Sequence, residues 1–160
     1  MDSQLLDDTG QKRLATMHKN LLIAVDKAPI GTEYRECYNL NMERLTPRSS
    51  VGEKPDRIRF PDFDEPHIAE HDHPNGQTFS MGDIQRVLER PNLQMLTAVG
   101  NDGSAYAIEK TDGVNQAKLL DLPFQVKKKY PEYKDHASDH VAMVLGFFEG
   151  AKEYGIQYQS

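Results

Sequence analysis

The sequence predicts a single α/β domain in which helices flank a mixed β-sheet. The chain has 160 residues, which is the size of one compact domain. Helical spacing and two-residue alternation of apolar side chains succeed each other along it, without a repeat or a low-complexity tract. The resulting order is helix, strands, helix, hairpin, helix, and this order is typical of an α/β domain. We therefore interpret residues 1–160 as one domain with its core in residues 10–110.

The first half of the chain is expected to begin with a helix and to continue as strands. Apolar residues at three- and four-residue spacing predict a helix over residues 9–28, capped by Asp8 or Thr9 and ended by Pro29. A polar stretch with two prolines, residues 46–57, is expected to form a loop or a loose hairpin turn. Alternating apolar residues predict three strands, over residues 32–40, 58–60 and 67–73.

The second half is expected to hold the clearest hairpin and a long final helix. An apolar face with a proline after it predicts a helix over residues 80–90. The turn triplet Asn101-Asp102-Gly103 joins two apolar runs and predicts a hairpin. The remaining expected elements are the hairpin strands 94–100 and 104–110, a short helix near 114–121, an apolar helix over 138–154 and a tail, 156–160.

Composition and charge exclude several classes of protein. The chain has 19 Lys and Arg against 25 Asp and Glu, a formal net charge of −6, which disfavours general nucleic-acid binding. Its one cysteine, Cys37, excludes an intramolecular disulfide framework and a Cys-rich zinc site, so that His and carboxylate groups would have to hold any metal. No apolar run approaches the ~20 residues of a membrane span, and the first residues lack a signal-peptide pattern. We expect a cytoplasmic protein without a membrane partner.

The strongest chemical signal lies between His71 and Asp83. His71 and His73 are two residues apart on an expected strand, so both imidazoles point to the same side and can bind one ion. Gly76 lets the chain turn back, and Asp83 lies one turn inside the next expected helix, within reach of the strand end. Two His and one carboxylate, with an open position for water, form a catalytic zinc set.

Each half of this pattern has a purely structural alternative. Ser80 and Asp83 together are typical of a helix cap, in which a hydroxyl and a first-turn acid bind backbone N–H groups. The His71 and His73 pair, taken alone, is most often a surface pair. The two halves at this spacing, with a proline and a glycine between them, favour the metal site. Ser80 can cap the helix and also point its hydroxyl at the site.

The same residues resemble a known family. His71-Asp72-His73-Pro74-Asn75-Gly76, followed by Phe79-Ser80-x-x-Asp83, is similar to the signature of the JAB/MPN+ (JAMM) zinc metallopeptidase domain. The nearest variants are the RadC-like branch and the JAB-like domains of phage and polymorphic-toxin proteins. The spacer between His73 and Ser80 has six residues, one fewer than is usual in the family. The resemblance covers roughly residues 10–110 and implies a cytidine-deaminase-like sheet arrangement, a Zn²⁺ cofactor and hydrolysis of an amide or isopeptide bond.

The resemblance also implies a glutamate that works as acid and base on an earlier strand. Glu33 and Glu36 are the candidates; they lie three residues apart, so on a regular strand they face opposite sides and one of them is a solvated residue. We choose Glu33, which follows the end of the first helix. The implied roles are proton transfer for Glu33, a hydrogen bond to the developing oxyanion for Ser80, and metal binding for His71, His73 and Asp83.

Three functions therefore stay open at the level of sequence. The first is a zinc peptidase or isopeptidase acting on a protein or peptide, for which the resemblance suggests ubiquitin-like, phage or toxin polypeptides. The second is a JAB-like binding module without turnover, and the third is a RadC-like role near DNA, which the acidic charge disfavours. Other polar features are interpreted as structural: His136 and His140 at a helix start, His67 on the surface, the basic triplet Lys127-Lys128-Lys129 in a loop, and Cys37 in the core.

Overall fold

A computed structural model shows one α/β domain built around a mixed sheet, as the sequence predicts. The structure describes residues 3–27, 33–46, 49–51, 62–73, 76, 78–129 and 146–159. Within these residues, six strands form the sheet in the order β2-β1-β3-β4-β5-β6. They are β1 (Glu33–Asn39), β2 (Ser49–Val51), β3 (His67–His73), β4 (Leu93–Gly100), β5 (Ala105–Lys110) and β6 (Ile156–Gln159).

The pairing of the strands places β3 in the interior of the sheet. β3 pairs antiparallel with β1 and parallel with β4, whereas β4 with β5 and β5 with β6 are antiparallel pairs. A parallel pair needs a crossover connection, and here the connection contains α2 (Met81–Glu89). The start of this crossover helix consequently lies beside the end of β3.

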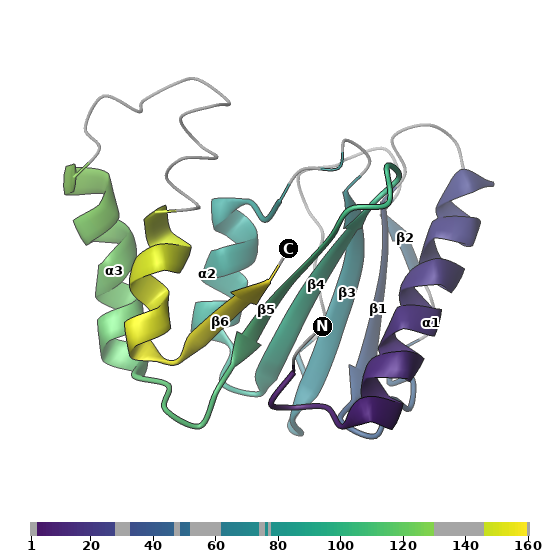
Figure 1. Cartoon of the computed structure of the whole chain (residues 1–160), viewed down its shortest axis with the longest axis horizontal. Helices are drawn as coiled ribbons and strands as arrows, with labels where there is room; N and C mark the ends of the chain where they lie inside the picture. Colours follow the sequence, from purple (N-terminus) through teal and green to yellow (C-terminus); the bar gives the residue numbers. More distant parts are fainter. Residues whose placement is uncertain are drawn as a thin grey trace.

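The helices cover both faces of the sheet (Figure 1). α1 (Asp8–Asp26) packs on one face, whereas α2 and α3 (Gln116–Lys129) lie on the other. Residues 146–151 are helical and continue into the short 3₁₀ helix η1 (Lys152–Tyr154), which ends at Gly155 with φ of +88°. The fold is thus three layers deep.

Each face of the sheet has its own core. Leu14 of α1 packs with Tyr38, Ile68 and Met95, all of which are buried. The larger core lies on the face of α2 and α3. It comprises Cys37, Ala69, Phe79, Ile84, Val87, Leu88, Leu93, Leu96, Ala98, Ile108, Leu119, Phe147, Phe148, Ala151 and Ile156. Because β3 and β4 are covered on both faces, all but one residue of each strand are buried, whichever face the side chain lies on.

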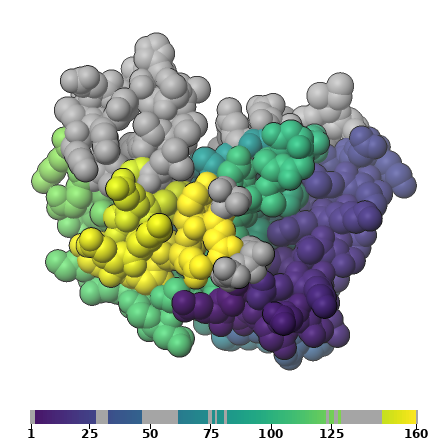
Figure 2. All heavy atoms as spheres, in the orientation of Figure 1, coloured from purple at the N-terminus to yellow at the C-terminus, as the bar shows by residue number. Residues whose placement is uncertain are grey.

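The chain ends differ from the sequence prediction. The expected tail after residue 155 is a strand, β6, which pairs with β5 and adds an edge to the sheet. The N-cap of α1 is Asp7 rather than Asp8 or Thr9, and its carboxylate accepts a hydrogen bond from the backbone N–H of Gly10 at 2.7 Å. Before α1, the backbone N–H groups of Gln4 and Leu5 each donate to Glu109 Oε1 of β5 at 2.7 Å. Figure 2 shows the N-terminal residues and the C-terminal segment on the same face of the molecule.

Two internal predictions also need correction. The helix expected near 114–121 is the longer α3, and it includes the basic triplet Lys127-Lys128-Lys129 that we had assigned to a loop. The polar stretch 46–57 contributes the short edge strand β2. The expected strand 58–60 and the histidines His136 and His140 lie outside the described residues.

No helix among the described residues combines the length and the apolar character that crossing a membrane requires.

Candidate metal centre

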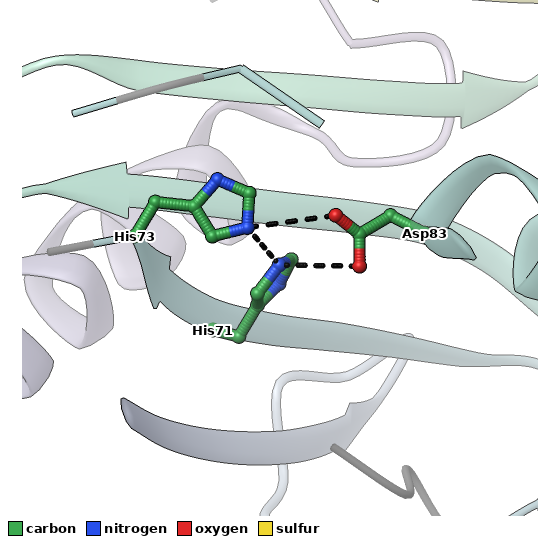
Figure 3. A group of neighbouring side chains, drawn as sticks. All are labelled: His71, His73 and Asp83. Carbon is green, nitrogen blue, oxygen red and sulfur yellow. Dashed lines mark hydrogen bonds and ion pairs between the residues drawn. The ribbon is translucent and has the colours of Figure 1, made fainter. Parts of the chain in front are cut away.

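Three side chains meet where β3 ends and α2 begins (Figure 3). His71 and His73 project from β3, and Asp83 reaches them from the first turn of α2. The two Nε2 atoms lie 2.7 Å apart. The Asp83 carboxylate has Oδ1 at 3.6 Å from His71 Nε2 and Oδ2 at 3.5 Å from His73 Nε2. The sequence-predicted ligand set is therefore assembled in one place.

These three groups fit a metal ion. One ligand atom from each residue lies within 4.8 Å of the others. Ligand atoms at about 2.0–2.1 Å from a tetrahedral Zn²⁺ are roughly 3.3 Å from one another, close to the carboxylate contacts and somewhat wider than the imidazole contact. His71 and Asp83 are buried and His73 is half-buried, so the group is largely shielded from solvent. Two imidazoles and a carboxylate are a donor set that divalent transition metals prefer.

Local sequence rules explain how each ligand is placed. His71 and His73 share a face because side chains alternate along β3, and Asp72 between them lies on the opposite face. On α2, Ser80 is the N-cap: its hydroxyl accepts from Asp83 N–H at 3.1 Å, and the Asp83 carboxylate accepts from Ser80 N–H at 2.9 Å. The capping box that we weighed as an alternative is therefore present. This pair of hydrogen bonds orients the Asp83 carboxylate toward the histidines. The same side chain of Asp83 therefore takes part in the cap and is a candidate metal ligand.

The electrostatics of Asp83 keep it ionised. Burial alone would raise the pKa of its carboxyl, but hydrogen bonds and charges from His71 and His73 outweigh burial and hold that pKa well below the usual range. Arg86, one helical turn further, donates from Nη1 to Asp83 Oδ1 at 3.2 Å. A carboxylate held ionised and oriented in this way is ready to bind a cation.

Glu33 lies on the metal side of the sheet. In the register of β1 and β3, Arg35 pairs with His71 and Cys37 with Ala69, so the odd-numbered residues of β1 share the face of the two histidines. Burial raises the pKa of the Glu33 carboxyl to about 7, and the charges of His73 and Asp83 act on it in opposite directions. These interactions place Glu33 in the electrostatic neighbourhood of the candidate ligands, with a pKa suited to proton transfer near neutral pH.

Glu36 lies on the opposite face, beneath α1. It pairs in register with Glu70, and the Tyr38 hydroxyl donates a hydrogen bond to its carboxylate. Arg44 lies 3.6 Å from its other oxygen. Our expectation that the second glutamate is solvated is wrong, because α1 covers this face and leaves Glu36 fully buried.

The prediction for His67 is also wrong. We expected a surface residue, but His67 is 1% exposed at the start of β3. Its ring packs edge-on against Phe63, and its Nδ1 lies 3.0 Å from the backbone oxygen of Glu65. Because β3 is an interior strand with both faces covered, a polar residue on it is buried as well. Cys37 is a buried core residue, as predicted.

Two glycines support the site, and no local sequence pattern points to one of them, Gly100. Gly100, at the end of β4, pairs in register with His73, and a Cβ added to it would lie 2.6 Å from Gly76 Cα and 2.4 Å from Ser104 Oγ. Gly76, with φ of +65°, donates its N–H to His73 O at 2.9 Å. Its own carbonyl accepts from the Tyr106 hydroxyl at 3.2 Å. Gly76 therefore packs closely against the β4–β5 hairpin.

No family model, curated protein or solved structure matches the chain. The assignment of the site consequently depends on its own geometry and chemistry.

Proposed function

We propose that the protein is a zinc-dependent peptidase or isopeptidase of the JAB/MPN+ (JAMM) kind. The observation that carries the proposal is the meeting of His71, His73 and Asp83 on the face of the sheet that also holds Glu33. A metal-binding group alone is compatible with a metal ion that is only stored or that only stabilises the fold. A carboxyl group beside it, with a pKa raised to about 7, adds the acid and base that hydrolysis needs.

Each residue has a separate task. Zn²⁺ held by the three ligands would supply a Lewis acid that polarises the scissile carbonyl and would lower the pKa of water toward about 7. Glu33 accepts the proton from the attacking water and returns it to the leaving amine. The Ser80 hydroxyl accepts from Asp83 N–H and keeps its own proton to donate to the developing oxyanion. Ser80 is exposed, so a substrate can reach it.

The proposed substrate is a protein or peptide with an amide or isopeptide bond. Ubiquitin-like conjugates and phage or toxin polypeptides are the classes that the resemblance suggests. The net charge of −6 is compatible with a polypeptide substrate and disfavours a role on DNA.

The test combines metal analysis with cleavage assays on the purified protein. We expect one Zn²⁺ per chain by elemental analysis, and cleavage of members of a peptide library or of isopeptide-linked ubiquitin-like conjugates. Glu33→Gln should retain the metal and lose at least about a hundredfold in turnover, because a general base contributes 10²–10⁴-fold. Glu43→Gln, an exposed glutamate of the same type, is the matched control and should cleave normally.

The outcomes separate the alternatives. Cleavage that survives Glu33→Gln contradicts the mechanism. Zinc without cleavage of any substrate supports a binding module without turnover, and salt-sensitive DNA binding would favour the RadC-like role.

A further inference from the structure

Two tyrosines on neighbouring strands lie beside the segment that connects the candidate ligands. Tyr106 is on β5 and Tyr158 is on β6. In the register of the sheet, His71 pairs with Ala98 and Ala98 pairs with Tyr106, so Tyr106 lies on the same face as His71. Tyr158 pairs with Ile108, two residues after Tyr106, and therefore lies on that face as well. Both phenol groups belong to the metal side of the sheet.

The Tyr106 hydroxyl donates to a residue that is itself bonded to a candidate ligand. Its acceptor is Gly76 O, at 3.2 Å, and the N–H of the same glycine donates to His73 O at 2.9 Å. The Ser104 hydroxyl also lies 3.3 Å from Gly76 O, but it is only 2.6 Å from Asp102 Oδ1. A serine hydroxyl has one proton, and the shorter bond to a carboxylate is the stronger one. Tyr106 is therefore the main side-chain donor to Gly76, and Gly76 links it to His73.

The Tyr158 hydroxyl makes a second link, at the other end of the connection. It lies 3.1 Å from Thr78 Oγ1, and Thr78 is two residues before Ser80, the N-cap of α2. The cap in turn orients the Asp83 carboxylate through its two hydrogen bonds. The hydroxyls of the two tyrosines thus contact the connection between β3 and α2 near both of its ends.

The rings of both tyrosines pack against a buried aromatic residue of the same connection, Phe79. Phe79 is 1% exposed, and it lies edge-on to three other rings with centroids 6.1 to 6.4 Å away, those of Tyr106, Phe148 and Tyr158. Tyr158 also stacks on Phe148, with centroids 4.2 Å apart. Because these contacts fix the rings, replacing a tyrosine by phenylalanine removes its hydrogen bond and keeps its packing.

We propose that Tyr106 and Tyr158 are positioning residues of the candidate metal centre. Their hydroxyls hold Gly76 and Thr78 in place, and these two residues lie between the candidate ligands His73 and Asp83 in the chain. Groups that orient metal ligands from outside raise the affinity for the metal, because less ordering remains to be done when the ion binds. The strand β6 thereby contributes to the metal centre. The inference rests on the metal binding of the proposed function and not on cleavage.

The experiment measures the metal affinity of Tyr106→Phe and Tyr158→Phe in the intact chain. Competition with a chromogenic chelator gives the Kd for Zn²⁺, and the visible absorption of the Co²⁺-substituted protein reports the coordination geometry. Each variant should bind Zn²⁺ about three- to tenfold more weakly, as expected for one lost neutral hydrogen bond, and should alter the Co²⁺ spectrum. Tyr154→Phe is the matched control, because Tyr154 is also half-buried against the larger core, and it should change neither quantity.

Variants of Thr78 test whether the hydroxyl contact itself carries the effect. Thr78→Val removes the partner of the Tyr158 hydroxyl, and Thr78→Ser keeps it. We expect Thr78→Val to weaken Zn²⁺ binding as much as Tyr158→Phe, the double variant to bind no more weakly than either single variant, and Thr78→Ser to bind like the wild type. Thermal unfolding of the metal-free proteins checks that each variant is folded. A loss of stability shared by the metal-free and metal-bound states changes no Kd, so a purely structural role leaves the Zn²⁺ affinity unchanged.

The inference and the proposed function fail in different ways. Unchanged Zn²⁺ affinity in both Tyr106→Phe and Tyr158→Phe, or additive effects of Thr78→Val and Tyr158→Phe, overturns the positioning role even if cleavage is observed. Zn²⁺ affinity that depends on the tyrosines, without cleavage of any substrate, supports the positioning role and overturns the peptidase. A wild-type protein that binds no Zn²⁺ overturns both.

Discussion

Glu33 and Glu36 lie three residues apart on β1, and their side chains lie on opposite faces of the sheet. Glu33 shares the face of the candidate metal ligands and interacts with the charges of His73 and Asp83. Glu36 is buried beneath α1, hydrogen-bonded to Tyr38. Because only Glu33 shares the face of the candidate ligands, we propose Glu33, and not Glu36, as the acid and base of the reaction.

Removing the metal should lower the melting temperature of the protein. A ligand that binds the folded state at a hundred times its Kd stabilises it by about 2.7 kcal/mol. For a chain of this size we expect chelation to lower Tm by roughly 5–10 °C. Asp83→Asn should bind zinc weakly and show little response to the chelator. His67→Gln, on the same strand but outside the ligand group, should respond like the wild type, and an identical response in Asp83→Asn would argue against the ligand set.

The rate of cleavage should depend on the ionisation of Glu33. Its carboxyl must be ionised to accept a proton, and burial raises its pKa to about 7. A bound dication lowers that pKa, so we expect kcat/KM to rise with pH through a limb at or below about pH 7. A pH–rate profile measures the limb. Activity that is flat from pH 5 to pH 8 is the contrary result.

Ser80→Gly should separate the cap from the chemistry. A glycine N-cap costs only a few tenths of a kcal/mol of stability, whereas alanine costs about 1 kcal/mol. Losing the hydroxyl should nevertheless reduce kcat by a factor of about 10²–10³ if it stabilises the oxyanion. Urea unfolding and steady-state kinetics measure the two effects. If kcat falls no more than stability accounts for, Ser80 is a capping residue alone.

Gly100→Ala should lower the metal affinity although Gly100 is not a candidate ligand. The added methyl group would lie 2.6 Å from Gly76 Cα, so Gly76 or Gly100 must move. Because Gly76 donates its N–H to the carbonyl of His73, a candidate ligand, we expect metal affinity to fall about 10–100-fold, as for other groups that orient ligands. A competition titration with a chromogenic chelator measures the affinity. Gly103→Ala, at the tip of the same hairpin, meets no atom within 4 Å; its φ of +86° adds strain, but it should leave metal affinity unchanged.

Acid should lower the unfolding free energy of the protein because His18, which lies on the α1 face of the sheet, resists protonation in the folded state. Burial lowers the pKa of His18 from 6.5 to about 4, so its contribution to stability is present above pH 6.5 and is lost as the pH falls toward 4. The loss is at most ~3 kcal/mol, because a protonated His18 would gain attraction from Glu70, 3.5 Å away. His18→Gln should show a smaller drop in unfolding free energy between pH 7 and pH 4.5. Parallel curves for the two proteins would contradict this assignment.

Patterns that depend on neighbouring residues were predictable. The alternation of His71 and His73, the cap formed by Ser80 and Asp83, and the hairpin around Asn101 to Gly103 are set within a few residues of chain, and the structure contains each of them. The three-residue offset between Glu33 and Glu36 likewise predicted that the two carboxylates would face opposite sides.

Features that depend on distant pairing were not predictable. The segment Ile156–Gln159 becomes a strand because β5 offers it an edge, and β5 lies almost fifty residues earlier in the chain. Glu36 and His67 are buried because helices or other strands cover both faces of the interior strands, and local polarity indicates the opposite. The contact of Gly100 with Gly76 depends on the parallel pairing of β3 and β4.

The sequence by itself thus determined which residues can bind a metal and which two glutamates compete to act with it. The tertiary structure decided which face of the sheet each glutamate occupies, and it brought Asp83 to the two histidines. The physical reason is that side-chain direction follows from local backbone geometry, whereas burial and proximity follow from how strands and helices distant in the chain pack together.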